Sequence, residues 1–208
     1  MYEKSVVADD LHVALGGEPV LQGFSLSTSP GEIVAVVGPN GSGKSTLLRC
    51  LAGLQPVERG RVTVFGVAPS DDAAFWRDVA LLTDEPAWYP GLTSREHLEL
   101  VEVVHGKPRM TAETALGLFE LTGRADAPPQ NLSTGQRQRL SLAAAFLRPS
   151  RLLLLDEPER GLDASFRVRL AELVAAYAAE GGTVVMATHD PALADCARQV
   201  SPAGQATP

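Results

Sequence analysis

The sequence contains only two cysteines, Cys50 and Cys196, among its 208 residues. They lie far apart and show no spacing typical of metal ligands, which argues against a cysteine-based metal site. We expect free, buried thiols in a reducing compartment, and a single disulfide bridge is the alternative.

Basic residues are outnumbered: 18 lysines and arginines face 25 aspartates and glutamates, for a formal net charge of -7. Affinity for nucleic acids comes mostly from clustered Lys and Arg that release counterions from phosphates. The charge balance therefore argues against a nucleic-acid partner, although it is compatible with a local basic patch.

Long apolar runs are absent from the sequence. The most apolar stretches, "EIVAVVG" (32–38) and "RLLLLD" (151–156), are far too short to cross a bilayer and are typical of buried strands. The opening "MYEKSVVADDL" lacks the apolar core of a secretory signal. We expect a cytoplasmic protein, for which any work at a membrane requires another chain to do the crossing.

What remains is an ordinary globular composition, with 45% hydrophobic residues and no internal repeats or low-complexity segments. This length suits one large domain with a real hydrophobic core. Short, partly alternating apolar runs in 5–28, separated by "GGEP", predict antiparallel strands joined by a tight turn. "GRVTVFG" (60–66) predicts a further strand.

The rest of the chain alternates between strands and helices. "EIVAVV", "RLLLLD" and "TVVMAT" predict buried strands, whereas "KSTLLRCLAGL", 164–179 and a short last segment predict helices. Such alternation implies a parallel sheet between layers of helices. Residues 93–147 differ: Thr93 and Glu96 have capping-box spacing, and "TAETALGLFELTG" shows helical periodicity with a terminal glycine. They predict a helical insertion.

The stretch "GPNGSGKST" follows a predicted buried strand and opens a helix, which is the context required of the pattern G-x-x-x-x-G-K-[ST]. Its glycines let backbone N–H groups turn toward an anion, and the helix N-terminus adds partial positive charge. Lys44 is expected to reach the β- and γ-phosphates, and Ser45 to bind Mg²⁺. The full predicted phosphate loop comprises Gly38, Pro39, Asn40, Gly41, Ser42, Gly43, Lys44, Ser45 and Thr46.

Two carboxylates follow the leucine strand, at the end where open α/β sheets place their ligands. Asp156 can hold the Mg²⁺ hydration shell, and Glu157 can orient and polarise an attacking water. An acidic pair on its own often marks only where the chain leaves the core, but its pairing with the phosphate loop favours the catalytic interpretation.

The whole chain resembles an ATP-binding-cassette (ABC) ATPase. "LSTGQRQRL" (132–140) resembles the family's signature motif, "GLD" (161–163) its D-loop, and His189 in "ATHD" its switch histidine. The resemblance implies a single α/β domain, 1–208, with a P-loop NTPase (RecA-like) core, a mainly parallel sheet, an N-terminal antiparallel β-subdomain and a helical subdomain insertion. The implied divisions are 1–92 for the β-subdomain and first part of the core, 93–147 for the helical subdomain, and 148–208 for the remaining core.

The residues also suggest what the signature stretch does. Ser133 and Gln136 have capping-box spacing, so Ser133 is expected to start a helix, with Gly135 allowing close backbone approach. In the family this helix end binds the γ-phosphate of ATP held by a second cassette. The resemblance therefore implies a head-to-tail pair, of identical or different chains, around two Mg²⁺-ATP. Asp163 would communicate between the two sites, and His189 would help position the water.

Two departures from the family pattern affect the site. Leu15 stands where the family usually has an adenine-stacking aromatic residue, which predicts a raised KM and weak discrimination between ATP and GTP. Asp84 stands where the Q-loop glutamine is expected, which predicts an Mg²⁺-binding carboxylate and altered metal dependence. The alternative for Asp84 is an alignment slip in an exposed loop.

We expect an ATPase subunit attached to the inner face of the cell membrane through an integral membrane transporter subunit. The chain's length resembles short cassettes of export systems, which favours export. The aromatic residues of "WYPG" (88–91) either receive that membrane subunit or pack under the helical insertion. The alternatives are a soluble ABC ATPase and a regulatory nucleotide-binding module with negligible turnover.

Overall fold

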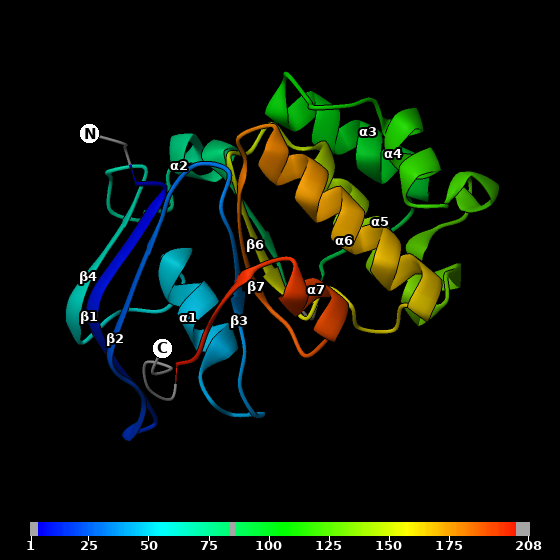
Figure 1. The fold of residues 1–208 in the computed structure, drawn as a ribbon. Helices are drawn as coiled ribbons and strands as arrows, with labels where there is room; N and C mark the ends of the chain where they lie inside the picture. Colours follow the sequence, from blue (N-terminus) through cyan, green and yellow to red (C-terminus); the bar gives the residue numbers. More distant parts are fainter. Residues whose placement is uncertain (1–3, 84–85, 203–208) are drawn as a thin grey trace.

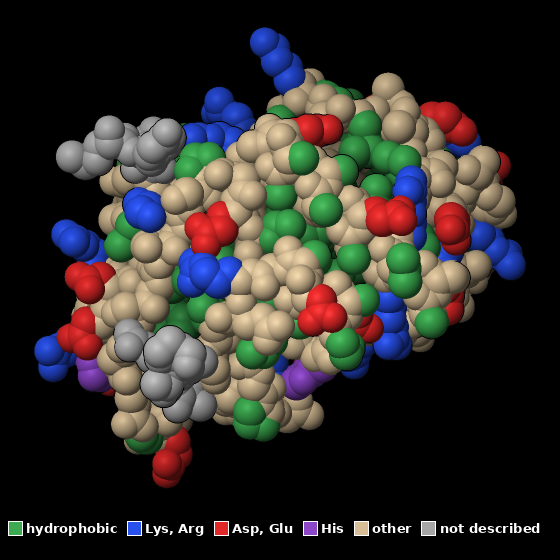
Figure 2. Space-filling model, in the orientation of Figure 1, with side chains coloured by type: hydrophobic (Ala, Val, Ile, Leu, Met, Phe, Trp, Pro, Cys, Tyr) green, Lys and Arg blue, Asp and Glu red, His purple; other side chains and the backbone are tan. Residues whose placement is uncertain are grey.

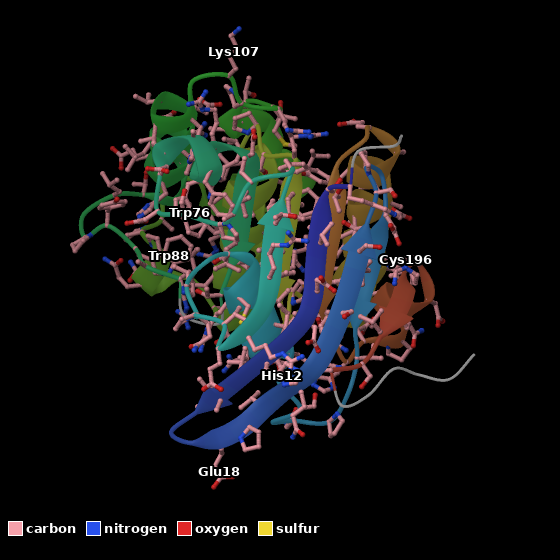
Figure 3. All side chains as sticks on the ribbon, turned by 90° about the vertical axis from the view of Figure 1, so that its left-hand side faces the viewer. His12, Glu18, Trp76, Trp88, Lys107 and Cys196 are labelled. Atoms are coloured by element: carbon pink, nitrogen blue, oxygen red, sulfur yellow. The ribbon has the colours of Figure 1, made fainter. Side chains whose placement is uncertain are left out.

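The computed structural model describes residues 4–83 and 86–202. Three of its strands form an antiparallel sheet in the order β2-β1-β4, seen on the left of Figure 1. They are β1 (Val6–Leu15), β2 (Glu18–Thr28) and β4 (Arg59–Val64). The predicted hairpin turns at Gly16 and Gly17, both with positive φ. Figure 3 shows Glu18 at the tip of this hairpin, at the opposite end of the molecule from Lys107.

The second sheet has five strands, all parallel, in the order β5-β6-β7-β3-β8. They are β3 (Ile33–Val36), β5 (Val79–Leu82), β6 (Leu152–Asp156), β7 (Thr183–Ala187) and β8 (Arg198–Val200). Strand β6 shows why a continuous leucine run suits this place: alternate side chains enter two different cores. Leu153 and Leu155 join one core, whereas Leu152 and Leu154 join the other.

Helices cover both faces of the parallel sheet, and the predicted α/β class is confirmed (Figure 1). Helix α1 (Lys44–Leu51) lies between the two sheets and packs in the core shared with the antiparallel strands. Helix α6 (Ala164–Ala179) covers the other face, with the bounds that the sequence predicts. The short helix α7 (Pro191–Asp195) precedes β8.

The regular secondary structure of residues 93–147 is entirely helical. The boundary of this segment as a subdomain stays a prediction. These elements are α3 (Ser94–His105), α4 (Ala112–Leu118), the 3-10 turns η1 (Thr122–Arg124) and η2 (Pro129–Asn131), and α5 (Thr134–Leu147). The predicted capping box of Thr93 and Glu96 starts α3. Helix α4, however, does not continue to the glycine at 123, because Glu120 adopts a left-handed conformation (φ 55°).

Three elements were not anticipated from the sequence: helix α2 (Ala73–Asp78) and the edge strands β5 and β8. All three are six residues or shorter, which leaves little periodicity to detect.

Within the described ranges, none of the helices is long and apolar enough to span a membrane. Figure 2 shows acidic and basic side chains interspersed on the face it presents.

Candidate active site

The predicted phosphate loop connects β3 to the start of α1. Gly41 and Gly43 have φ values of 77° and 92°, which glycine adopts at least cost. A Cβ at Gly43 would come within 2.9 Å of Val20 Cγ1 and 3.0 Å of Leu21 Cδ2, so a larger residue would have to shift these side chains of β2. Among the described residues, no side chain caps the N-terminus of α1. The helix therefore presents its first N–H groups to a ligand.

The Lys44 side chain lies inside this loop and bonds to its main chain. It is only 6% exposed, and its Nζ donates to the carbonyl oxygens of Gly38 and Pro39, both at 3.0 Å. Ser42 Oγ is buried in the same loop and has no hydrogen-bond partner within the described part of the chain. A buried ammonium, an orphaned hydroxyl and an uncapped helix start together fit an anionic group such as a phosphate.

Ser45 and Asp156, 111 residues apart, meet at the end of β6. Ser45 Oγ donates to Asp156 Oδ1 at 3.0 Å, and Asp156 is 7% exposed. A hydroxyl and a carboxylate are hard oxygen ligands of the kind that Mg²⁺ takes, with water and substrate phosphates completing its shell. These two residues therefore fit the predicted magnesium site.

Glu157 follows in a strained conformation, with φ 45°. Its N–H donates to Ala187 O at 2.9 Å, so the β6–β7 pairing holds its main chain while the side chain turns outward. The His189 ring lies near, with Nε2 3.9 Å from Glu157 Oε1, and both side chains are about two-fifths exposed, at 43% and 40%. The structure therefore places the predicted water-orienting pair at the ends of neighbouring strands.

A pocket of about 300 Å³, the phosphate pocket, lies between the phosphate loop and Glu157. Leu15, at the end of β1 and 43% exposed, forms part of its wall. The lining residues are Leu15, Val20, Asn40, Gly41, Gly43, Lys44, Ser45, Thr46 and Glu157. This pocket brings the loop's positive charge and the Glu157 carboxylate to one place.

The signature residues form the N-terminus of α5. The predicted capping box is present: Ser133 Oγ accepts from Gln136 N at 3.2 Å, and Gln136 Oε1 accepts from Ser133 N at 3.0 Å. Gly135 allows a close backbone approach, as predicted, but the approaching group is the carbonyl of Gly161 in the D-loop. A Cβ on Gly135 would lie 2.5 Å from that oxygen.

Asp163 caps α6 and contacts the signature helix. Its Oδ1 accepts from Ser165 Oγ at 2.5 Å and from Phe166 N at 2.9 Å, and its Oδ2 pairs with Arg139 Nη2 at 2.6 Å. These contacts, the Ser165 hydroxyl first, lower the pKa of Asp163 to about 2. Arg139 also pairs with Glu120 and lies 4.0 Å above the Phe166 ring.

A second pocket, of about 490 Å³, opens beside these residues. It is lined by Glu120, Ser133, Thr134, Gly135, Gln136, Arg139, Gly161 and Asp163. The lining residues of the phosphate pocket and the signature pocket, all within the described ranges, have no member in common. The predicted site residues therefore fall into two separate groups.

Several residues of this region were missed by the sequence interpretation. Gln138 Nε2 donates to the carbonyls of Glu157 (3.3 Å) and Pro158 (3.0 Å), and so ties α5 to the loop after β6. Arg139 pairs with Asp163 of the D-loop, and the Glu159 carboxylate accepts a hydrogen bond from His189 N. The available signal was position alone: Gln138 and Arg139 lie within the signature stretch 132–140, and Glu159 lies two residues after Glu157.

The other predictions have mixed outcomes. Asp84 lies outside the described residues. Both cysteines lie within them and are free, and Cys50 is buried, which raises its thiol pKa to about 11. Cys196 is exposed at the C-terminal end of α7 (Figure 3), so the expectation of two buried thiols was wrong.

The two aromatic residues of "WYPG" differ in burial. Trp88 is partly buried and packs edge-on to His97 of α3, whereas Tyr89 is 63% exposed.

Comparison with known proteins identifies the family. The family model described as "ABC transporter" matches residues 21–160. The chain is 38% identical to the cytochrome c biogenesis ATP-binding export protein CcmA of Gluconobacter oxydans over 88% of this chain and 80% of that protein. It is 34% identical to the sn-glycerol-3-phosphate import ATP-binding protein UgpC of Paracoccus denitrificans over 89% of this chain, but spans only 54% of that relative.

A solved structure described as the ATP-binding subunit of an ABC transporter has the same fold. It superimposes with a TM-score of 0.83 at 30% identity, covering 94% of this chain and 85% of that one.

Proposed function

The chain belongs to the ABC transporter family of ATP-hydrolysing proteins, and on that premise we propose that it binds and hydrolyses ATP as one of two paired cassettes that drive a separate membrane subunit. The observation that carries this proposal is the separation of the phosphate pocket from the signature pocket. Each pocket has the polar groups of half a nucleotide site.

On the phosphate side, Lys44 and the N-terminus of α1 would bind the β- and γ-phosphates of ATP. Ser45 and Asp156 would hold Mg²⁺, whose contribution is to neutralise charge on the phosphate oxygens. The neighbouring Glu157 carboxylate would orient a water for attack on the γ-phosphorus. The bond from that phosphorus to the bridging oxygen then breaks, which leaves ADP and inorganic phosphate. His189, 3.9 Å from Glu157, would help to hold the water and the γ-phosphate.

On the signature side, Ser133, Gly135 and Gln136 would contact the γ-phosphate of ATP bound to the second cassette. Because Ser133 and Gln136 cap their own helix here, the main-chain N–H groups beside them are held in place for that contact. If the two chains are identical, a two-fold axis makes both sites equivalent, with Asp163 near each boundary.

Attachment to a membrane subunit would use the helical side of the molecule. Tyr89, which precedes α3, and Val103 and Val104, which lie on α3, are 63%, 80% and 68% exposed, and such exposed apolar side chains are suited to a protein partner. We place the protein on the inner face of the cell membrane through this contact. Relatives named as import proteins and as export proteins both match, so the preference for export stays a prediction.

ATP turnover by the purified protein tests the enzymatic part. We expect Lys44→Ala to lower kcat by at least about 100-fold, because the charge on the β- and γ-phosphates loses its partner. Removing Mg²⁺ with a chelator should have a similar effect. Arg49→Ala is the matched control, since Arg49 is an exposed cation on the same helix. ATP binding without turnover would favour a regulatory module, and purification from membranes without a polytopic partner would favour a soluble ABC ATPase.

A further inference from the structure

Glu159 is a buried carboxylate between two parts of the candidate site. It lies two residues after Glu157 and two residues before the D-loop, and only 8% of it is exposed. A buried carboxylate is costly unless hydrogen bonds compensate for its lost hydration. Its partners therefore indicate what the carboxylate does.

Within the described part of the chain, both hydrogen bonds of the Glu159 side chain go to the segment that carries His189. Its Oε1 accepts from His189 N at 2.7 Å and from Thr188 Oγ1 at 2.8 Å. The Thr188 hydroxyl in turn accepts from Asp190 N at 3.0 Å. Hydrogen bonds to a charged acceptor are shorter and stronger than neutral ones. A single carboxylate oxygen thus holds the main-chain N–H of His189 directly and that of Asp190 through the Thr188 hydroxyl.

The second carboxylate oxygen of Glu159 contributes no hydrogen bond within the described part of the fold. Oε2 is buried and has no hydrogen-bond partner among residues 4–83 and 86–202. An apolar or neutral side chain would fill the same volume without the cost of burying a charge. Stability of the fold therefore does not account for a glutamate here, whereas a rigidly held 188–190 segment does.

The other end of Glu159 is tied to the catalytic loop. Arg160 N donates to Glu157 O at 3.0 Å, and Leu162 N donates to Glu159 O at 3.1 Å, so residues 157–162 form successive turns. Glu159 also lines a pocket of about 290 Å³. The lining residues are Glu157, Glu159, Arg160, Arg167, His189, Asp190 and Pro191. Glu157 and His189, the two groups assigned to the water, are thus linked through Glu159.

We propose that Glu159 is a positioning residue for ATP hydrolysis: it holds the main chain of His189 so that the imidazole faces Glu157. This inference rests on the proposed ATPase function. Glu159 is not among the residues that line the phosphate pocket, so it acts on turnover and not on ATP binding.

The test is steady-state ATP hydrolysis by Glu159 variants with and without His189. Glu159→Ala lowers kcat about tenfold, the effect of losing hydrogen bonds to a charged group, while KM for ATP stays within about twofold. Glu159→Gln keeps most of kcat, because its amide oxygen still accepts from His189 N and Thr188 Oγ1. His189→Ala lowers kcat by about 100-fold. Adding Glu159→Ala to His189→Ala has little further effect, because the position that Glu159 holds no longer carries an imidazole.

The matched control is Glu32→Ala. Glu32 also accepts from a main-chain N–H, that of Ser29 at 2.8 Å, but at the start of β3, and its loss leaves kcat unchanged. Glu159→Asp is the second test, in case the alanine variant does not fold. It retains the charge but shortens the side chain by one methylene, and we expect it to show the same loss of kcat.

Full kcat in Glu159→Ala or Glu159→Asp overturns the proposal, and so does an equal kcat loss in the His189→Ala background. If the wild type and Glu32→Ala are also inactive, the ATPase assignment fails instead.

Discussion

At the scale of single residues, we expect the side chain of Leu15 to affect nucleotide affinity. It lies on the wall of the phosphate pocket, where the family pattern leads one to expect an aromatic platform for the base. An aliphatic side chain excludes water there but offers no ring face for stacking. Base stacking contributes about 1 to 3 kcal/mol per base at such sites.

We therefore expect Leu15→Tyr to lower the KM for ATP by about tenfold and to leave kcat nearly unchanged. The measurement is a titration of initial rates with ATP and with GTP. Leu54→Tyr is the control, because Leu54 is another exposed leucine (55%) that does not line the pocket. Equal KM values for wild type and Leu15→Tyr with both nucleotides would show that the base binds elsewhere.

Residue contacts were predictable where they are local or follow from strand order. The capping boxes of α3 and α5 depend on residues three apart, so the sequence alone indicates them. The meeting of Ser45 with Asp156 follows because parallel strands end at the same edge. The contact of Gly161 O with Gly135 could not be predicted, because it depends on how two loops pack in three dimensions.

Among the elements, α4 illustrates a helix end that periodicity does not reveal. Leu121 N donates to Leu116 O at 2.7 Å and Glu120 N to Gly117 O at 3.1 Å, which is the Schellman pattern. Glu120 occupies the left-handed position that glycine usually takes (φ 55°). The turn directs Phe119 and Leu121, both 0% exposed, into the core. Core packing thus ends the helix before the glycine that the pattern suggests.

This helix end makes a stability prediction. Glu120→Gly and Glu120→Ala both lose the ion pair with Arg139, so the two variants differ only in how they tolerate a positive φ. We expect the free energy of unfolding of Glu120→Gly to exceed that of Glu120→Ala by about 1 kcal/mol. Urea denaturation of the two proteins measures the difference. A more stable alanine variant would mean that residue 120 is not left-handed in solution.

Long elements were predicted from the sequence more completely than short ones, because a longer element shows more of its hydrophobic periodicity. The bounds of α6 were predicted fully because 16 residues show four turns of periodicity. The edge strands β5 and β8, four and three residues long, gave no such pattern. Their positions come from parallel pairing with β6 and β3, which only the folded sheet supplies.

At the scale of the whole molecule, one chain holds two separate pockets, and we propose that each is half of a nucleotide site. The phosphate pocket contains Lys44, Ser45 and Glu157, and the signature pocket contains Ser133, Gly135 and Asp163. Gln138 links the signature helix to the loop after β6, and Glu159 links that loop to His189, so hydrogen bonds connect the segments that carry the two pockets. A γ-phosphate bound between two protomers would join one pocket to the other, and its hydrolysis would release the pair.

The mass of the Glu157→Gln protein in saturating Mg²⁺-ATP, measured by light scattering, tests this account most directly. Without the carboxylate that orients the water, bound ATP persists, and we expect a dimer. The double variant Lys44→Ala with Glu157→Gln, which lacks the phosphate-binding cation, should stay monomeric. A Glu157→Gln protein that binds ATP yet stays monomeric, both alone and in its native membrane complex, would contradict the account.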